Sequence, residues 1–216
     1  MKKTVLIGMP NTGKSTFFNK ISGASAKVGN WPGITVDLTS IKTLINGEMT
    51  ELIDLPGIYN LNGYSEDEEV VINFIENNKI DHVFFIMNAT QIDRQLPLAI
   101  NIQKLGIPTT ILANMIDEAK SLGITFDFEL MGKLIGCPVL PISAKFGQGF
   151  DEINKKVNRP KKQKINLKSA DEQSLSQKVF DKSYQMIFYI VGLSFLPLRE
   201  RGIIGGLISL ALPTRS

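Results

Sequence analysis

Residues 8–15 of this chain read Gly8-Met9-Pro10-Asn11-Thr12-Gly13-Lys14-Ser15. The run fits the pattern G-x-x-x-x-G-K-S, a turn whose backbone N–H groups point inward at a phosphate. The apolar run at 3–8 predicts a buried strand before the turn, and the pattern at 14–22 predicts a helix after it. Because strand, turn and helix in this order are the context that the pattern requires, the stretch predicts a P-loop.

The residues of the loop have separate physical roles. Gly8 and Gly13 allow the backbone to bend. Lys14 supplies a positive charge for the β- and γ-phosphates and has a catalytic role, while Ser15 supplies a hydroxyl for Mg²⁺. The N-terminus of the following helix adds its own positive field. We therefore predict nucleotide contacts from Gly8, Met9, Pro10, Asn11, Thr12, Gly13, Lys14, Ser15 and Thr16.

Apolar runs alternate with helical patterns as far as residue 158. Strands are expected at 3–8, 36–45, 49–54, 82–88, 108–113 and 138–142, and helices at 14–22, 91–105 and 149–157. Asn46-Gly47 is expected to be a two-residue hairpin turn, because both of its positions need a positive φ. The alternation predicts an α/β fold with a mostly parallel six-stranded sheet, one antiparallel hairpin and helices on both faces.

A second motif, Asp54-Leu55-Pro56-Gly57, ends the strand predicted at 49–54. Asp54 can reach the coordination shell of Mg²⁺, and Gly57 lets a backbone N–H approach the γ-phosphate. By itself, D-x-x-G is a common turn. Its place at a strand end after the P-loop makes it a candidate part of the same nucleotide site.

A third motif, Asn114-Met115-Ile116-Asp117, points to the base. The Asp117 carboxylate can accept two hydrogen bonds from the N1 and N2 edge of guanine, and adenine offers no such pair. Met115 stands where G proteins usually have a lysine, so its stem can cover the base but a cation is lost. Ser143-Ala144-Lys145 follows the last predicted strand, where a backbone N–H would meet guanine O6.

A candidate switch, Gly33-Ile34-Thr35-Val36-Asp37, lies between the first helix and the hairpin. The Thr35 hydroxyl can complete the coordination of Mg²⁺ only when a γ-phosphate is present, which would make this loop a switch. A lone threonine is weak evidence, so the assignment depends on the other motifs. The predicted Mg²⁺ ligands are Ser15, Thr35 and Asp54.

The five motifs occur in the order and approximate spacing of the Ras-like GTPases. Within that class the runs VGNWPGITV (28–36), DLPGIY (54–59) and NMID (114–117) resemble FeoB, the bacterial ferrous iron transporter family, and LIGCPV (134–139) is also similar. The resemblance covers residues 1 to about 157. It implies a GTP-binding and GTP-hydrolysing domain whose nucleotide state gates Fe²⁺ uptake.

Ile58 stands where Ras-like enzymes have the glutamine that orients the attacking water. The resemblance implies the same apolar substitution in FeoB, so the backbone of Gly57 or of the loop containing Thr35 must place the water, and turnover is expected to be slow. The acidic run 66–69 follows Ser65, a candidate N-cap. It is interpreted as the first turn of a helix, with a role in positioning water as the alternative.

Asn11 is the fourth residue of the P-loop motif and has two interpretations. No arginine lies near the predicted phosphates to offset charge in the transition state. In FeoB-like and TrmE-like GTPases an Asn at this position ligates K⁺, so the resemblance implies a K⁺ site at Asn11, with carbonyls from residues 29–31. The alternative is that Asn11 only stabilises the turn.

The composition excludes several kinds of protein. The single cysteine, Cys137, excludes an internal disulfide, and the single histidine, His82, excludes a His-rich metal cluster. We interpret His82 as a strand-edge residue and Cys137 as a core residue. A net charge of +3 is too small to indicate nucleic acid. The N-terminus shows no signal peptide, so the chain is expected to start in the cytoplasm.

The pattern changes after residue 158. We predict a FeoB-type G domain at 1–158, a basic linker at 159–168 and a helical, apolar segment at 169–216 that is divergent or truncated. The apolar runs 184–198 and 202–212 are each shorter than the roughly 20 residues of a membrane-spanning helix. They carry enough apolar surface to predict packing on the domain, on a partner or at a membrane surface.

Three functions compete at this point. The first is a GTPase module of a ferrous iron uptake system, next to a membrane permease domain or membrane surface on the cytoplasmic side of the bacterial inner membrane. The second is an RNA- or ribosome-associated GTPase of the Era or TrmE type, although no RNA-binding domain is visible and no nucleic-acid partner is expected. The third is a slow, nucleotide-responsive binding module with the apolar C-terminal segment as its docking element. If the chain is a soluble fragment, it is expected to be cytoplasmic. The pattern leaves homo-oligomerisation open.

Overall fold

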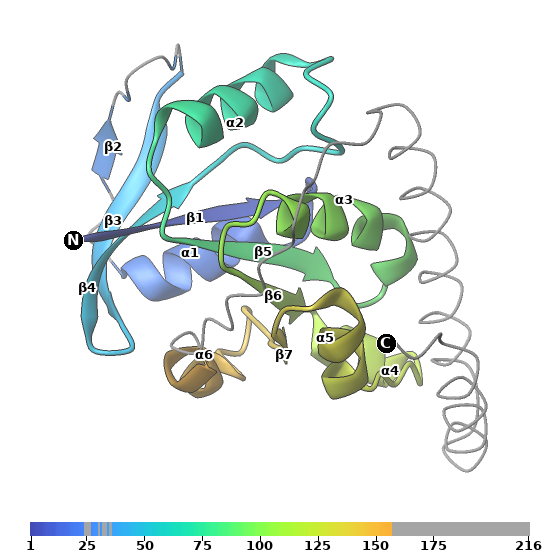
Figure 1. Ribbon diagram of the computed structural model, residues 1–216. Helices are drawn as coiled ribbons and strands as arrows, with labels where there is room; N and C mark the ends of the chain where they lie inside the picture. Colours follow the sequence, from blue (N-terminus) through green and yellow to red (C-terminus); the bar gives the residue numbers. More distant parts are fainter. Residues whose placement is uncertain (24–26, 30, 32–33, 35, 157–216) are drawn as a thin grey trace, which may run out of the picture.

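A single mixed sheet organises the protein (Figure 1). The computed structural model describes residues 1–156 except 24–26, 30, 32–33 and 35, and the linker and C-terminal segment predicted from residue 159 onward lie outside it. The strand order is β2-β3-β4-β1-β5-β6-β7. The strands are β1 (Lys2–Gly8), β2 (Lys27–Gly29), β3 (Leu38–Ile45), β4 (Glu48–Asp54), β5 (His82–Asn88), β6 (Thr109–Asn114) and β7 (Val139–Pro141).

Strands β4, β1, β5, β6 and β7 run parallel, and β3 joins them through the predicted antiparallel hairpin with β4. The turn residues Asn46 and Gly47 have φ values of 55° and 76°, which confirms the Asn-Gly hairpin turn. The seventh strand, β2, pairs antiparallel with β3 at the edge of the sheet. Its three residues are too few to show the alternation of a strand in the sequence, which is why six strands were expected.

Helices cover both faces of the sheet, as predicted (Figure 1). Their bounds are α1 (Lys14–Ser22), α2 (Glu66–Asn77), α3 (Ile92–Lys104), α4 (Ile116–Ser121), α5 (Phe128–Ile135) and α6 (Phe150–Lys156). Phe17 of α1 and Ile153 of α6 belong to one hydrophobic cluster, whereas Phe74 of α2 and Met131 of α5 belong to the cluster on the other face. Two separate apolar layers therefore hold the sheet between them.

The parallel strands bring their carboxyl ends to one edge. Gly8 pairs in register with Ile86 of β5, and Asn88 at the end of β5 pairs with Asn114 at the end of β6. Asp54, the last residue of β4, pairs with Leu6 on the other side of β1. Because ligands of open α/β sheets bind beyond the carboxyl ends of the strands, the predicted motifs meet at the expected edge.

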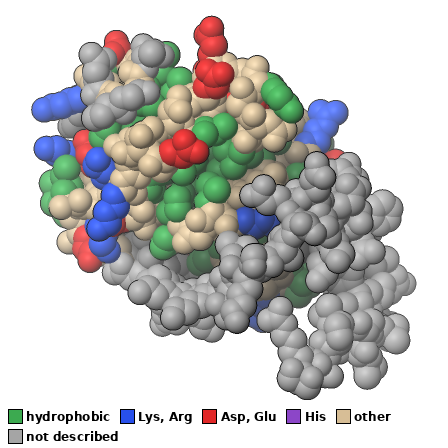
Figure 2. Space-filling view, turned by 45° about the horizontal axis from the view of Figure 1, so that its top comes forward, with side chains coloured by type: hydrophobic (Ala, Val, Ile, Leu, Met, Phe, Trp, Pro, Cys, Tyr) green, Lys and Arg blue, Asp and Glu red, His purple; other side chains and the backbone are tan. Residues whose placement is uncertain are grey.

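Most large apolar side chains are buried, but several lie on the surface. Figure 2 shows apolar side chains reaching the surface over the middle of the face that it views. Tyr59 and Tyr64, on the loop between β4 and α2, are 65% and 86% exposed. Within the described part of the chain, every helix is too short or too polar to cross a membrane.

Candidate nucleotide-binding site

The P-loop is a tight turn between β1 and α1. Asn11 and Gly13 adopt the left-handed conformation, with φ values of 62° and 83°. The hydroxyl of Thr12 donates to the carbonyl of Met9 at 2.9 Å, which closes the turn on itself. A Cβ atom on Gly8 would lie 2.3 Å from the carbonyl oxygen of Ile86 on the neighbouring strand, so glycine is needed there for contact with β5 rather than for the turn alone.

Asn114 joins the P-loop to the segment predicted to meet the base. Its side-chain Nδ2 donates to the carbonyl of Thr12 at 2.9 Å. Its Oδ1 accepts from the backbone N–H of Ala144 at 2.8 Å. All three residues are buried, at 2% exposure or less. Because a buried amide with both ends bonded fixes the groups around it, Asn114 sets the distance between the phosphate loop and the 143–145 segment.

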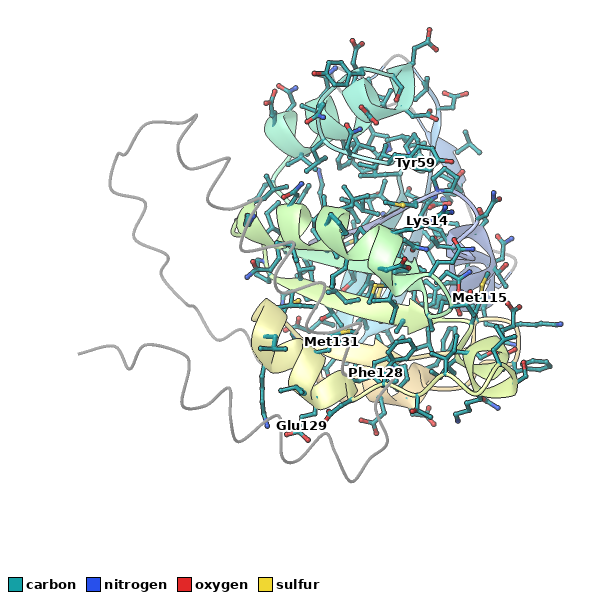
Figure 3. All side chains as sticks on the ribbon, turned by 90° about the vertical axis from the view of Figure 1, so that its right-hand side faces the viewer. Lys14, Tyr59, Met115, Phe128, Glu129 and Met131 are labelled. Atoms are coloured by element: carbon teal, nitrogen blue, oxygen red, sulfur yellow. The ribbon has the colours of Figure 1, made fainter. Side chains whose placement is uncertain are left out.

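Lys14 and Asp54, which the sequence assigned to a phosphate and to Mg²⁺, contact one another. Nζ of Lys14 lies 2.8 Å from Oδ1 of Asp54. Their side chains are 12% and 17% exposed. The contact joins the start of α1 to the end of β4 and places both charged groups in the same small region. Figure 3 shows Lys14 between Tyr59 and Met115 along this edge of the molecule.

The D-x-x-G turn rests on the P-loop. The backbone N–H of Ile58 donates to the carbonyl of Gly8 at 3.1 Å. A Cβ atom on Gly57 would lie 3.0 Å from the backbone nitrogen of Pro10, tighter than an ordinary contact. The side chain of Ile58 is only 1% exposed and packs in the core, as does that of Leu55. The side chains of Ile58 and Leu55 are buried and cannot hydrogen-bond to a water molecule in the site. The backbone of Gly57, in contrast, lies directly against the P-loop.

The predicted base end of the site forms where β6 and β7 end. Met115 adopts a left-handed φ of 61° and caps α4, and Asp117 lies half-buried in the first turn of that helix. The ε-methyl group of Met115 reaches toward the P-loop, 3.6 Å from where a Cβ atom of Gly13 would lie. Lys145 places its ammonium 5.2 Å from the centre of the Phe146 ring. The hydrogen bond between Asn114 and Ala144 brings the N-x-x-D and S-A-K segments together.

Ser143 is fully buried, and its hydroxyl finds no hydrogen-bond partner among the described residues. Its backbone N–H and carbonyl pair with those of Gln148, a residue that belongs to none of the sequence motifs. A Cβ atom on Gly149 would lie 2.4 Å from the carbonyl of Pro141, so this glycine lets the loop close. The glycines Gly147 and Gly149, which follow S-A-K after Phe146, were the signal that could have identified this small loop.

The structure describes the candidate switch only in part. Thr35 and Gly33 lie outside the described residues, and with them the contacts that the sequence predicts for Thr35. Ile34 packs against the core, whereas Val36 and Asp37 are exposed. Just before them, the Trp31 ring packs edge-on against Phe74 of α2, with 5.2 Å between ring centres, and the ammonium of Lys3 lies 4.9 Å from its centre.

The acidic run after Ser65 is the first turn of α2. The Ser65 hydroxyl accepts from the backbone N–H of Glu68 at 3.3 Å, which confirms the predicted N-cap. The Glu68 carboxylate accepts from the backbone N–H of Tyr64 at 3.0 Å and is almost fully buried. This geometry supports the capping interpretation of the run, because Glu68 is committed to the start of the helix.

His82 and Cys137 lie outside the site. His82 opens β5, as expected, and its Nε2 lies 3.0 Å from the Thr110 hydroxyl. Burial, with a smaller contribution from the charge of Lys2, lowers the pKa of His82 from 6.5 to about 4. Burial also raises the pKa of the Cys137 thiol to about 12, so the thiol is protonated and belongs to the core.

The oxygen atoms at this edge suit the predicted cations. Asp54 offers a carboxylate, and Ser15 offers an exposed hydroxyl at the start of α1. Mg²⁺ prefers such hard oxygen ligands and leaves part of its shell to substrate phosphates. Asn11 is exposed, so its amide oxygen is free to face a ligand, although its left-handed φ also fits a residue that only stabilises the turn.

Together these features define a P-loop domain of the GTPase type: a phosphate loop after β1, an acidic residue ending β4, and a base motif after β6 bound to that loop by Asn114. A sequence profile of the family "Ferrous iron transport protein B" matches residues 2–157. The chain belongs to this family, and the part that matches is the N-terminal GTPase domain of FeoB.

Two curated relatives illustrate the match. The Fe(2+) transporter FeoB of a Synechocystis species is 48% identical over 158 residues, which cover 73% of this chain and 26% of that protein. The Fe(2+) transporter FeoB of Legionella pneumophila (strain Paris) is 33% identical over 199 residues, which cover 87% of this chain and 26% of that protein. The chain thus spans about a quarter of the length of these relatives.

Solved structures agree with this assignment. The GDP-bound G domain of S. thermophilus FeoB, in a mutant form, superposes with a TM-score of 0.66 at 36% identity, covering 73% of this chain and 60% of that one. The cytosolic domain of L. pneumophila FeoB gives 0.70 at 30% identity, covering 86% of each chain. The cytosolic domain of T. maritima FeoB in its GMPPNP form gives 0.72 at 27% identity, covering 100% and 88%.

Proposed function

We propose that this domain binds GTP and hydrolyses it to GDP and phosphate. The observation that carries the proposal is the bridge through Asn114, which bonds to the P-loop at Thr12 and to the 143–145 segment at Ala144. One buried side chain thereby sets the spacing between a phosphate site and a base site. Asp117 lies in the first turn of α4, in the same motif that Asn114 begins. We expect its carboxylate to pair with N1 and N2 of guanine.

Hydrolysis of GTP is carried out by the residues at the phosphate end of the site. Lys14 contacts the β- and γ-phosphates, and the backbone N–H groups of the P-loop and of Gly57 surround the γ-phosphate. Ser15, Asp54 and Thr35 would hold Mg²⁺, whose positive charge would offset the negative charge that develops on the phosphate oxygens. Ile58 is buried and offers no hydrogen bond to water, so the backbone must orient the attacking water. We therefore expect slow intrinsic turnover.

We further propose that K⁺ stimulates hydrolysis through Asn11. The exposed amide of Asn11 stands in the phosphate loop, and its carbonyl oxygen is a neutral ligand that suits a large, weakly hydrated cation. In the described part of the chain, the arginine Arg94 lies exposed on α3 rather than in the phosphate loop. A monovalent cation would supply the positive charge between the β- and γ-phosphates that an arginine supplies elsewhere.

The relatives that share this domain are named Fe(2+) transporters, and we propose the same role for the whole protein here. The nucleotide state of the domain would gate Fe²⁺ movement through a membrane permease domain on the cytoplasmic side of the bacterial inner membrane. Growth on limiting ferrous iron, with the wild-type gene and with a Lys14→Ala gene, tests this role. Equal growth of the two strains would contradict it.

Nucleotide selectivity is the direct test of the proposed activity. GTP and ATP affinities and phosphate release are measured on the same protein. GTP bound at least about tenfold more tightly than ATP, with slow phosphate release, is the expected result, since adenine leaves the Asp117 carboxylate unpaired. Tight GTP binding with no phosphate release would favour the nucleotide-responsive binding module instead, and equal affinity for ATP would contradict the guanine site.

A further inference from the structure

The side chain of Trp31 is held by two elements that are distant from it in the sequence. Its ring packs edge-on against Phe74 of α2, with 5.2 Å between the ring centres, and Phe74 is fully buried. The ammonium group of Lys3, on β1, lies 4.9 Å from the centre of the same ring. Because an aromatic pair and a cation over an aromatic face are both attractive, Trp31 is fixed to the sheet and to α2 at once.

Lys3 is itself held in place for this contact. Its backbone N–H donates to the carboxylate of Asp81 at 2.9 Å, and its backbone carbonyl accepts from the N–H of Asp81 at 2.9 Å. Successive side chains of a strand point to opposite faces. The neighbouring Lys2 forms an ion pair with Glu48, whereas the positive charge of Lys3 meets the Trp31 ring.

The anchor extends along the chain as far as Ile34. The carbonyl of Trp31 accepts from the backbone N–H of Ile34 at 3.1 Å, and both side chains pack against the same core cluster. The next fixed point is Leu38, which begins β3 and is 3% exposed. Thr35, the predicted ligand of Mg²⁺, therefore comes directly after one anchored residue and shortly before another.

We propose that Trp31 is a positioning residue for Thr35, and that Phe74 and Lys3 hold it in that role. Helix α2 follows the D-x-x-G turn, so the same contact joins the two segments expected on either side of the γ-phosphate. A segment that is already anchored loses less conformational entropy when Thr35 engages Mg²⁺ and the γ-phosphate. The anchor therefore strengthens the binding of GTP and not that of GDP. This inference rests on the proposed function, namely GTP and Mg²⁺ at this site.

Lys3 offers the sharpest test, because its charge can be removed without opening the core. Lys3→Met keeps an apolar stem and loses the ammonium, whereas Lys3→Arg keeps a cation for the ring. Affinities for GDP and for GMPPNP, a GTP analogue that is not hydrolysed, are measured by calorimetry in Mg²⁺. Lys3→Met is expected to bind GMPPNP about threefold more weakly, the size of a partly exposed cation–π contact, with GDP affinity unchanged, and Lys3→Arg should restore the loss.

Lys2→Met is the matched control. It removes the charge of the neighbouring residue on β1, whose partner is Glu48 rather than an aromatic ring, and it should bind both nucleotides as wild type does. A loss that is equal for GDP and GMPPNP in Lys3→Met, or no loss for either, would overturn the positioning role. So would a Lys3→Arg variant that binds GMPPNP no better than Lys3→Met.

A double variant shows whether Lys3 acts through Thr35. If it does, Thr35→Ala and the double variant Thr35→Ala, Lys3→Met bind GMPPNP equally, because the anchor has no hydroxyl left to position. Additive losses would contradict the proposal, and so would a Thr35→Ala variant that binds GMPPNP as tightly as wild type. Failure of the wild type to bind either nucleotide would instead overturn the proposed function, and the positioning role with it.

Discussion

Gly13 and Asn114 are in such close contact that a Cβ atom on the glycine would lie 2.3 Å from Nδ2 of the asparagine. Gly13 belongs to the phosphate loop, and Asn114 begins the base motif. The same Nδ2 donates to the carbonyl of Thr12, one residue earlier in the loop. The two halves of the candidate site are therefore fitted directly against each other, without an intervening side chain.

Gly13→Ala is expected to abolish nucleotide binding, because the new methyl group displaces Asn114 and opens the bridge between the two motifs. We expect GDP affinity to fall at least about a hundredfold, since several charge-assisted contacts depend on this geometry. Gly106→Ala is the matched control: its φ of 75° is similarly strained, but no atom lies within 4 Å of its Cβ position. It should cost about 1 kcal/mol of stability and leave GDP affinity unchanged. Equal losses in both variants would assign the effect to backbone strain.

Asp117→Asn should shift the preference of the domain from GTP toward xanthosine triphosphate. The substitution replaces an acceptor by a donor, and the xanthine edge offers the complementary carbonyl. Competition of GTP and xanthosine triphosphate for one fluorescent nucleotide measures the shift, which should be at least about tenfold. Asp151→Asn, on the exposed first turn of α6, removes the same charge away from the base motif and should change nothing.

Thr35→Ala is expected to slow GTP hydrolysis strongly while leaving GDP affinity nearly unchanged. The reason is that Thr35 is predicted to engage only when a γ-phosphate and Mg²⁺ are present. Lys14→Ala, in contrast, should abolish both binding and turnover, because Lys14 meets phosphates of both nucleotides. Single-turnover hydrolysis and GDP titration separate the two effects. A Thr35 variant that loses GDP affinity as much as turnover would count against the switch assignment.

Replacing Na⁺ by K⁺ at constant ionic strength should accelerate GTP hydrolysis, and variants of Asn11 should identify the ligand. Asn11→Gly keeps a residue that readily adopts the left-handed φ of 62° but removes the amide oxygen. Asn11→Ala removes the oxygen and strains the turn as well. If the oxygen ligates K⁺, both variants lose the stimulation. If Asn11 only stabilises the turn, the glycine variant keeps the stimulation.

Acidification should destabilise the fold through His82. Its pKa is about 4 in the folded protein and 6.5 when unfolded, because burial opposes the charged ring. The unfolded chain therefore binds the proton first as the pH falls. The contribution of His82 to stability is full above pH 6.5, declines between 6.5 and 4, and levels off below, for a total of about 3 kcal/mol. Urea unfolding of wild type and His82→Gln across this range measures the difference, which should vanish if His82 is exposed in solution.

The sequence predicted much of the fold because the main signals are local. A few neighbouring residues determine the conformation of the P-loop motif, of the apolar strands and of the Asn46-Gly47 turn. Strand β2 and helix α4 were missed because three and six residues carry too little periodicity. Helix α5 was not expected, although the sequence carries signals for both of its ends: Asp127 caps its N-terminus and Gly136 ends it.

The parts of the candidate site that sequence could not supply are contacts between distant residues. The bond from Asn114 to Thr12 spans 102 residues, and the pair of Lys14 with Asp54 spans 40. Each of these residues belongs to a motif, but the motifs do not predict that the side chains of Lys14 and Asp54 contact each other. The loop closed by Ser143 and Gln148 likewise depends on the position of Gly149 against Pro141.

Trp31 is the single tryptophan of the chain, and its ring packs against Phe74 with an ammonium group, that of Lys3, above it. Both neighbours affect the fluorescence of the Trp31 indole: Phe74 shields the ring from water, and the ammonium of Lys3 acts through its charge. The protein therefore contains its own optical probe, four residues before Thr35. Emission spectra recorded while nucleotides are added would follow this segment in unlabelled protein, and Phe74→Leu would change the starting signal.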